Sequence, residues 1–207
     1  MKYKAFVFDL DGTLYHQFPL RVLMVIRLGV YYLLRPHRLR ELLLLRAYRK
    51  LRESLYGKGQ RNFDALQLAE AARKCGMPCE DAQRVITEWM IYKPLGLVRI
   101  FRRRKLLSLI KSLQCAGKII IVYSDYPVRE KLQALGLEPD YAYFSNDPAI
   151  NCMKPDPSGL GRVIKALGLD VGDMLYVGDR DNKDGECARG AGVKYMDVHA
   201  FEKKPPA

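Results

Sequence analysis

Apolar residues along the chain follow three successive patterns: a short run at residues 5–8, a helical repeat over residues 16–96, and an alternation of strand-like and helix-like segments after residue 97. The first pattern predicts a buried β-strand, and the second predicts helices only. Later strands are predicted at residues 118–123, 141–144, 174–177 and 193–198, and helices at 102–114, 127–135, 158–167 and 186–191. Strands that alternate with helices indicate an α/β fold with a mainly parallel sheet between two layers of helices.

The segment from residue 16 to residue 96 is expected to fold as an all-helical insert. Five apolar residues share one face of a helix that opens at Pro36: Leu44, Ala47, Tyr48, Leu51 and Leu55. The sequence Gly57-Lys58-Gly59 ends this helix, a second runs from the capping residue Asn62 to Lys74, and a third covers residues 80–90. The predicted domains are therefore a core of residues 1–15 and 97–207 and an insert of residues 16–96.

Composition favours a globular protein. Of the 207 residues, 49% are apolar, which is enough for a packed core. The leucine-rich stretch at residues 20–45 is interrupted by charged residues: Arg21, Arg27, Arg35, Arg38 and Arg40. Because no run of about 18 uncharged apolar residues remains, we expect amphipathic helices and no membrane partner. Five cysteines without metal-site spacing and an N-terminus unlike a signal peptide favour a reduced, cytoplasmic protein.

Positive charge is concentrated in the insert. Residues 16–96 contain 15 Lys and Arg but only 7 Asp and Glu, so they carry +8 of the net charge of +12. This asymmetry suggests an anionic partner for the insert, and the alternative is a solvated helical face that keeps the protein soluble. The insert lacks the interleaved aromatic and basic residues of a nucleic-acid-binding surface, so we do not expect nucleic acid as a partner.

Two carboxylates directly follow the first predicted strand. Asp9 and Asp11 are two positions apart, so both side chains should emerge on the same side of the strand end, and Gly12 allows a sharp turn after them. Two acids this close repel each other unless a cation or a shared proton lies between them. The pair is therefore a metal site, a nucleophile with its acid/base partner, or both.

Six further polar residues lie at or near the ends of later strands: Ser124 and Asp125 after the second strand, Lys154 in a loop, and Asp179, Asp181 and Asp184 after the fourth strand. Because the carboxyl ends of parallel strands meet at one edge of a sheet, we expect these side chains to converge with the first acid pair. Acids, a hydroxyl group and a lysine at one edge are typical of phosphoryl chemistry on Mg²⁺.

Four short motifs stand in a fixed order along the chain. They are Asp9-Leu10-Asp11-Gly12-Thr13, Ser124 after a hydrophobic strand, Lys154-Pro155, and Gly178-Asp179 followed by Asp184. In this respect the chain resembles the haloacid dehalogenase-like (HAD) hydrolase superfamily. The resemblance spans residues 3 to about 198 and implies a Rossmann-like, three-layer core. The insert between the first and second motifs then resembles the helical cap of the family's first cap class.

The resemblance also implies a role for each motif residue. Asp9 would be the nucleophile that forms an aspartyl-phosphate, and Asp11 would protonate the leaving group and then activate water. The implied ligands of Mg²⁺ are Asp9, the backbone carbonyl of Asp11, and Asp179, with Asp184 supporting the site. The implied phosphoryl-binding residues are Gly12, Thr13, Ser124, Asp125 and Lys154. The implied function is Mg²⁺-dependent hydrolysis of a phosphate monoester of a small molecule.

One motif residue departs from the family pattern, and the cap adds an expectation about the substrate. Many relatives carry Asn where Asp125 stands, but the family uses the backbone N–H of this residue, so activity should survive. Caps of this class close over the site, exclude water and set substrate choice, with Tyr15 and His16 at the expected hinge. The positive charge of the cap suggests an acidic substrate, with more than one phosphate or carboxylate.

Three alternatives to a phosphatase stay open. Dehalogenases of the superfamily lack the second acid of the first motif, so Asp11 favours phosphate esters over carbon–halogen bonds. A phosphomutase is compatible with the motifs, and so is a phosphonatase, which needs a cap lysine such as Lys50, Lys58, Lys74 or Lys93. The alternative from another class is a non-enzymatic binding protein that uses the basic cap.

Overall fold

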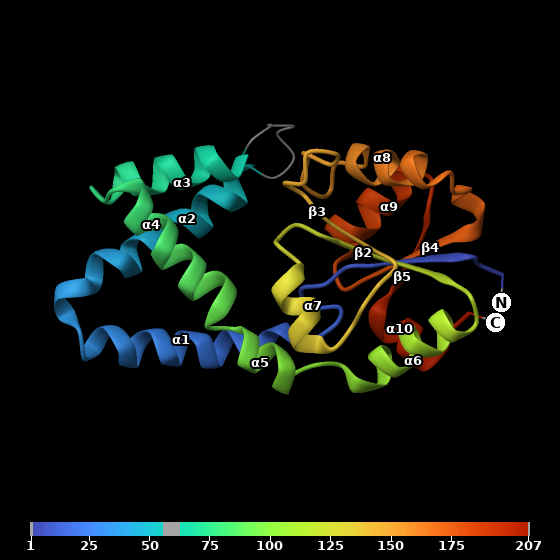
Figure 1. The fold of residues 1–207 in the computed structure, drawn as a ribbon, viewed down its shortest axis with the longest axis horizontal. Helices are drawn as coiled ribbons and strands as arrows, with labels where there is room; N and C mark the ends of the chain where they lie inside the picture. Colours follow the sequence, from blue (N-terminus) through green and yellow to red (C-terminus); the bar gives the residue numbers. More distant parts are fainter. Residues whose placement is uncertain (1, 56–62, 207) are drawn as a thin grey trace.

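The computed structural model describes residues 2–55 and 63–206, which form two lobes (Figure 1). Five strands make the sheet of the larger lobe: β1 (Ala5–Phe8), β2 (Ile119–Ser124), β3 (Tyr141–Phe144), β4 (Met174–Gly178) and β5 (Lys194–Asp197). They lie in the order β3-β2-β1-β4-β5, and all four pairings are parallel. The predicted α/β fold with its parallel sheet is confirmed, and each predicted strand lies within one residue of the observed bounds.

Helices cover both faces of this sheet. They are α6 (Arg104–Cys115), α7 (Arg129–Leu135), α8 (Ser158–Leu167), α9 (Glu186–Gly190) and α10 (Val198–Lys203). Because successive strand residues point to opposite faces, Phe6 and Phe8 of β1 pack in one core with Phe201, while Ala5 and Val7 pack in the other. Helices α8 and α9 lie on one side of the sheet and α6 and α10 on the other (Figure 1). The core therefore has three layers.

Helix α6 begins two residues later than the sequence predicted, and the reason is a pairing between two chain segments. Arg102 forms an antiparallel bridge with Tyr15, and the backbone N–H of Arg103 donates to the carbonyl of Leu14 at 3.0 Å. The N–H of His16 donates to the carbonyl of Phe101 at 2.9 Å. These extended segments run side by side where the chain leaves the larger lobe and returns to it, so the prediction of a helix from residue 102 was wrong.

The smaller lobe consists of helices. They are α1 (Gln17–Leu33), the 3-10 helix η1 (Pro36–Arg38), α2 (Leu39–Leu55), α3 (Phe63–Lys74), α4 (Cys79–Ile86), the π-helix η2 (Thr87–Tyr92) and α5 (Leu95–Ile100). The described residues between 16 and 96 contain no strand. The helix predicted at 80–90 is present, but its second half is a π-helix. Gly57, Gly59 and Asn62 lie outside the described residues, and the limits 16–96 of the insert stay a prediction.

Candidate active site

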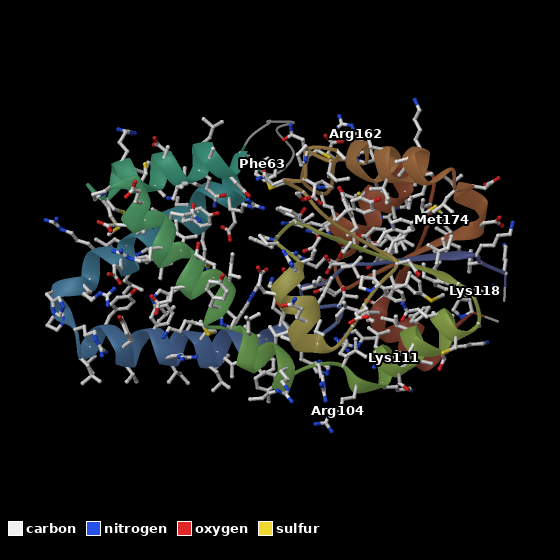
Figure 2. The ribbon with its side chains drawn as sticks, in the orientation of Figure 1. Phe63, Arg104, Lys111, Lys118, Arg162 and Met174 are labelled. Carbon is white, nitrogen blue, oxygen red and sulfur yellow. The ribbon has the colours of Figure 1, made fainter. Side chains whose placement is uncertain are left out.

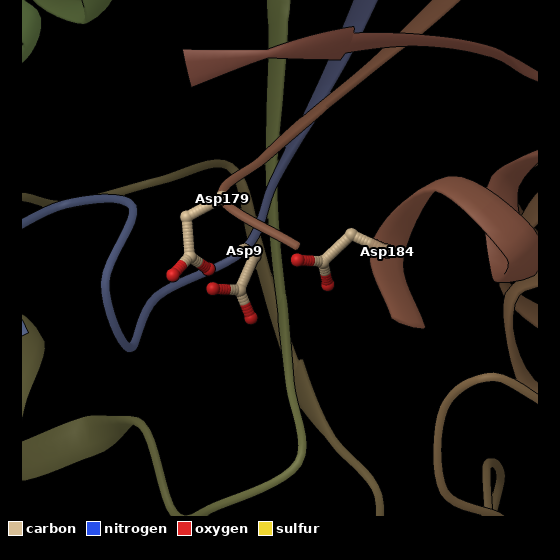
Figure 3. Close-up of side chains that lie close together, drawn as sticks. All are labelled: Asp9, Asp179 and Asp184. Carbon is tan, nitrogen blue, oxygen red and sulfur yellow. The ribbon is translucent and has the colours of Figure 1, made fainter. Parts of the chain in front are cut away.

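Three carboxylates meet at the carboxyl edge of the sheet (Figure 3). Asp9 follows β1, Asp179 follows β4, and Asp184 lies in the π-helix η4 (Asp181–Gly185). One oxygen from each lies within 4.8 Å of the others. Asp9 is fixed because its backbone N–H donates to the carbonyl of Val177 at 3.0 Å, which prolongs the pairing of β1 with β4. The strand ends thus bring these three acids together, as expected from their positions in the sequence.

Two glycines allow the acids to come this close. Gly12 has a φ of +105°, and a Cβ there would overlap the carboxylate of Asp179. A Cβ on Gly178 would lie 2.5 Å from the Cβ of Asp184. Both positions therefore require a residue without a side chain.

Lys154 connects two of the acids. Its Nζ donates to Asp9 Oδ1 at 2.6 Å and to Asp184 Oδ1 at 2.6 Å, and it lies 3.2 Å from the hydroxyl of Tyr176. The lysine is 1% exposed. Burial alone would lower the pKa of Lys154, but the charges of Asp184 and Asp9 outweigh burial and raise it well above its ordinary value. The lysine is therefore a permanent buried cation.

Even with this lysine, the cluster has an excess of negative charge. Burial, followed by the charge of Asp184, raises the pKa of Asp9 to about 8, although Lys154 acts in the opposite direction. Burial and Asp184 also raise the pKa of Asp179. Lys154, together with Arg180, whose Nε lies 4.0 Å from Asp179 Oδ1, offsets only part of the charge of the three carboxylates. A divalent cation, or protons at lower pH, would remove this imbalance.

The residues present fit Mg²⁺. Carboxylate oxygens are the hard donors that Mg²⁺ prefers, and the cluster keeps an excess of negative charge that a cation would offset. Asp179 Oδ1 is buried, lies 4.0 Å from Arg180 Nε and has no hydrogen-bond partner among the described residues, so it can serve as a ligand oxygen. Asp9, Asp179 and Asp184 would hold the ion. The predicted contribution of the Asp11 backbone carbonyl stays a prediction.

The side chain of Asp11 has different partners from the other acids. Its Oδ1 accepts from the hydroxyl of Tyr15 and from Lys131 Nζ, the latter at 2.5 Å. Its Oδ2 is buried without a hydrogen-bond partner in the described part of the chain. Burial acts to raise the pKa of Asp11, but Lys131, Tyr15 and Lys154 together outweigh burial and lower the pKa below its ordinary value. One oxygen of Asp11 is thus held in place, and the other remains available to a substrate.

Thr13 and Ser124 lie near these acids, but the prediction that Asp181 joins them was wrong, because its carboxylate is exposed and pairs with Arg189. The hydroxyl of Thr13 donates to Asp9 Oδ2 at 3.0 Å, and Ser124 ends β2 with its Oγ accepting from the backbone N–H of Tyr126 at 3.2 Å. Thr13 and Ser124 are both buried. Their predicted contacts with a phosphoryl group stay predictions.

The carboxylate of Asp125 has a structural contact. Its Oδ1 accepts from the hydroxyl of Ser145 at 2.8 Å and from the backbone N–H of Lys154 at 3.0 Å. These bonds connect the loop after β2 to the loop that carries Lys154. Asp125 therefore helps to place the lysine, which gives its negative charge a use other than substrate contact.

Arg52 on α2 reaches from the smaller lobe to the site. Its guanidinium donates to Asp64, to the side chain of Gln67 at 3.2 Å and to the backbone carbonyl of Asp125. It also lies 4.8 Å from the ring centroids of both Phe63 and Tyr126. Figure 2 shows Phe63 at the end of α3 that faces the larger lobe. The lobes are thus connected directly beside the second motif.

Sequence reasoning missed three of these side chains, namely Tyr15 as a partner of Asp11, Lys131, and Arg52. Tyr15 was expected only as part of a hinge. Lys131 had a usable signal, because it lies in the first helix after the second motif. No sequence signal pointed to Arg52, because it is separated from Asp125 by 73 positions.

The smaller lobe also contains a cleft of about 360 Å³. Its apolar lining comes from α1, α2 and η2: Met24, Leu28, Leu42, Leu45, Trp89 and Met90. Charged residues of α2 complete the lining: Arg46, Arg49, Lys50 and Glu53. The cleft therefore combines an apolar lining with a net positive charge, and Arg52, which contacts the larger lobe, is on the same helix.

A protein-family model described as haloacid dehalogenase-like hydrolase matches residues 3–192. A "probable D-glycero-D-manno-heptose-1,7-bisphosphate 7-phosphatase" of Thermoplasma acidophilum is 35% identical over 77 residues, 34% of this chain. The chain spans only 46% of the length of that relative in this match.

Solved structures share the fold. The 2-haloacid dehalogenase of Pseudomonas syringae is 21% identical, with a TM-score of 0.65 over 93% of this chain and 85% of that one. The hydrolase YfnB of Bacillus subtilis, bound to magnesium, is 14% identical, with a TM-score of 0.66 over 94% and 88% of the chains. At these identities the similarity shows the fold alone.

Proposed function

We propose a phosphatase function for this chain, which belongs to the haloacid dehalogenase-like hydrolase family. The reaction is the Mg²⁺-dependent hydrolysis of a phosphate monoester of a small molecule through an aspartyl-phosphate. One observation carries this proposal: the carboxylates of Asp9, Asp179 and Asp184 lie within 4.8 Å of one another, and Lys154 bonds two of them. This arrangement supplies a nucleophile together with ligands for a divalent cation.

In the proposed first step, a carboxylate oxygen of Asp9 attacks phosphorus while the bond from phosphorus to the leaving oxygen breaks. Asp11 would have to carry a proton for that oxygen, so that the product leaves as an alcohol; Lys131 lowers the pKa of Asp11, and the negative charge of the bound phosphate would act in the opposite direction. The hydrogen bonds from Tyr15 and Lys131 hold Asp11 so that its other oxygen is free for this transfer. In the second step Asp11 takes a proton from water, the water oxygen bonds to phosphorus, and Asp9 is released with inorganic phosphate.

The cations of the site lower the barrier to both steps. When bound, Mg²⁺ supplies a positive charge that screens Asp9 from the incoming phosphate and stabilises the charge that develops on its oxygens. Lys154 holds Asp9 in position and would contact a phosphoryl oxygen. Ser124 at the end of β2, which pairs with β1, and the backbone N–H of Asp125 would bind the same group.

We further propose an acidic substrate with a second phosphate or a carboxylate. Arg46, Arg49 and Lys50 on the cleft of the smaller lobe would complement such a group. The name of the Thermoplasma acidophilum relative, a phosphatase of a bisphosphorylated sugar, is consistent with this choice. The proposed location is the reducing cytoplasm, which is supported by five cysteines without disulfide bonds.

The other predicted functions gain no comparable support. A phosphonatase needs a lysine that reaches the substrate, but Lys74 and Lys93 lie in ion pairs with Glu70 and Glu88. Lys50 lines the cleft, and Lys58 lies outside the described residues. A binding protein without catalysis would have no need for three buried acids around a lysine, since burying unpaired charge destabilises the fold.

The test is phosphate release from a panel of phosphate esters, including an aryl phosphate and sugar bisphosphates, with and without Mg²⁺. The wild type is compared with Asp9→Asn and with the matched control Asp181→Asn, whose carboxylate is exposed and pairs with Arg189. We expect Mg²⁺-dependent turnover that is lost in Asp9→Asn and kept in Asp181→Asn. Equal turnover by wild type and Asp9→Asn would overturn the proposal, and so would the absence of turnover on every ester.

A further inference from the structure

The outer side of helix α1 is apolar and exposed. Six large apolar side chains make up this outer α1 face: Phe18, Val22, Val25, Ile26, Val30 and Leu33. Phe18 is 79% exposed and Leu33 is 81% exposed. In Figure 2 a row of side chains projects from α1 on the side away from the other described helices. Contiguous exposed apolar surface of this kind marks an interaction site.

The outer α1 face is additional to the side by which the helix packs into its own lobe. The inward residues Leu20, Met24 and Tyr32 are buried, and the ring of Tyr32 lies 5.8 Å from that of Trp89. From residue 22 onward, the outer residues are spaced by three and four positions, which places them on one stripe. With 17 residues, α1 presents a stripe roughly 25 Å long. Packing within the protein therefore does not account for these side chains.

Every charged residue of α1 and of the 3-10 helix η1 after it is an arginine. Residues 12–40 contain no Asp or Glu, but they contain five arginines: Arg21, Arg27, Arg35, Arg38 and Arg40. All of these are exposed except Arg38, which is half-buried. If a second copy packed on this face, arginines of the two copies would meet, and the acid that follows them in the chain, Glu41, already pairs with Arg38, so the contact is unfavourable. An anionic partner with an apolar layer complements both the stripe and its arginines.

We propose that the outer α1 face docks onto the surface of a bilayer that contains anionic lipids. The apolar side chains would enter the boundary between headgroups and acyl chains, and the arginines would contact lipid phosphates. This mode differs from spanning: no single described helix is long and apolar enough to cross a membrane. Helix α1 together with residues 36–54 passes that test only as a pair bent by 115°. The sequence led us to expect no membrane partner because no segment is suited to cross a bilayer. That argument does not apply to docking on the bilayer surface, which we now propose.

The test is sedimentation of the full chain with vesicles of phosphatidylcholine alone or of phosphatidylcholine with phosphatidylglycerol. The apolar variant is Val22→Gln/Ile26→Gln/Val30→Gln, and the charge variant is Arg21→Gln/Arg40→Gln. The matched control is Leu66→Gln/Val171→Gln, which removes exposed apolar side chains from other elements. Circular dichroism checks that each variant is folded. Hydrolysis of a soluble phosphate ester, where present, should be unchanged, because none of these residues belongs to the acid cluster.

We expect the wild type and the control to sediment with anionic vesicles and to be released by high salt. The apolar and charge variants should each bind at least about tenfold more weakly. Wild type that stays in the supernatant, or that binds both vesicle types equally, would overturn the proposal. A concentration-dependent dimer that the apolar variant abolishes, without vesicle binding, would assign the face to a second copy instead. This readout does not depend on the proposed phosphatase activity.

Discussion

Replacing Lys154 by Met tests whether the buried lysine acts through its charge. The ammonium group lies 2.6 Å from one carboxylate oxygen of Asp9 and 2.6 Å from one of Asp184, and all three side chains are at least 96% buried. Removal of one partner from a buried ion pair costs about 3–5 kcal/mol, because it leaves uncompensated charge. We expect Lys154→Met to lower the free energy of unfolding by that amount at about pH 9 without metal.

The origin of this loss predicts how it changes with conditions. Asp9 has a raised pKa, so its proton stabilises the folded state at low pH, and this contribution is lost as the pH rises through about 8. Without Lys154 the pKa of Asp9 rises further, so the difference between the variant and the wild type should shrink as the pH falls from about 9 to about 7. It should also shrink when Mg²⁺ saturates the site, since the ion then supplies the missing positive charge.

The assay is urea unfolding followed by circular dichroism, at neutral pH and at about pH 9, with and without Mg²⁺. The control Lys4→Met removes the same side chain from an exposed ion pair with Asp173, and it should leave the free energy of unfolding unchanged within error. An equal loss in Lys154→Met under all conditions would refute the reasoning. That result would mean that the lysine stabilises through the packing of its aliphatic carbons.

Three further predictions concern the acids. Lys131→Met should raise the pKa of Asp11, because Lys131 lowers that pKa. For alkyl phosphates, the decrease of kcat/KM at high pH should then begin at a higher pH. Gly178→Ala should weaken Mg²⁺ binding about 10- to 100-fold in calorimetric titration, because the new Cβ displaces Asp184. Wild-type Mg²⁺ affinity should rise with pH by up to about tenfold per unit below about 8, because the ion displaces the proton of Asp9.

Each of these predictions has its own control and a result that contradicts it. Gly161→Ala is the control for Gly178, since an added Cβ there meets nothing within 4 Å. Equal Mg²⁺ affinities of Gly178→Ala and Gly161→Ala would show that Asp184 does not contribute to metal binding. For Lys131→Met, the pH profile of kcat/KM is measured with alkyl phosphates and, as a reference, with aryl phosphates. If the alkyl phosphate profile is the same as that of the wild type, Asp11 is not the proton donor. Affinity independent of pH would contradict the raised pKa of Asp9.

The sheet and the convergence of the acids were predictable because both depend on local patterns. An apolar run such as Ala5–Phe8 identifies a buried strand, and parallel strands place the residues that follow them at one edge. The sequence was sufficient to bring Asp9, Asp179 and Asp184 together.

Other contacts depend on tertiary packing and could not be predicted. Lys131 and Asp11 are 120 positions apart, and their pairing requires α7 to pack beside the end of β1. The start of α6 was placed too early because Arg102 pairs with Tyr15, which is distant in sequence. The exposure of Leu33 could not be predicted either, because an apolar helical repeat usually indicates a buried face.

The central claim, that Asp9 is the nucleophile, is tested most directly by trapping the phosphorylated enzyme. Asp11→Asn with an aryl phosphate should form the aspartyl-phosphate, because this leaving group needs no proton, and should then hydrolyse it slowly. After acid quenching, intact-mass spectrometry should show the mass of one phosphoryl group, and peptide mapping should place it on Asp9. No adduct in Asp11→Asn during continued turnover, or an adduct that persists in Asp9→Asn/Asp11→Asn, would contradict the account.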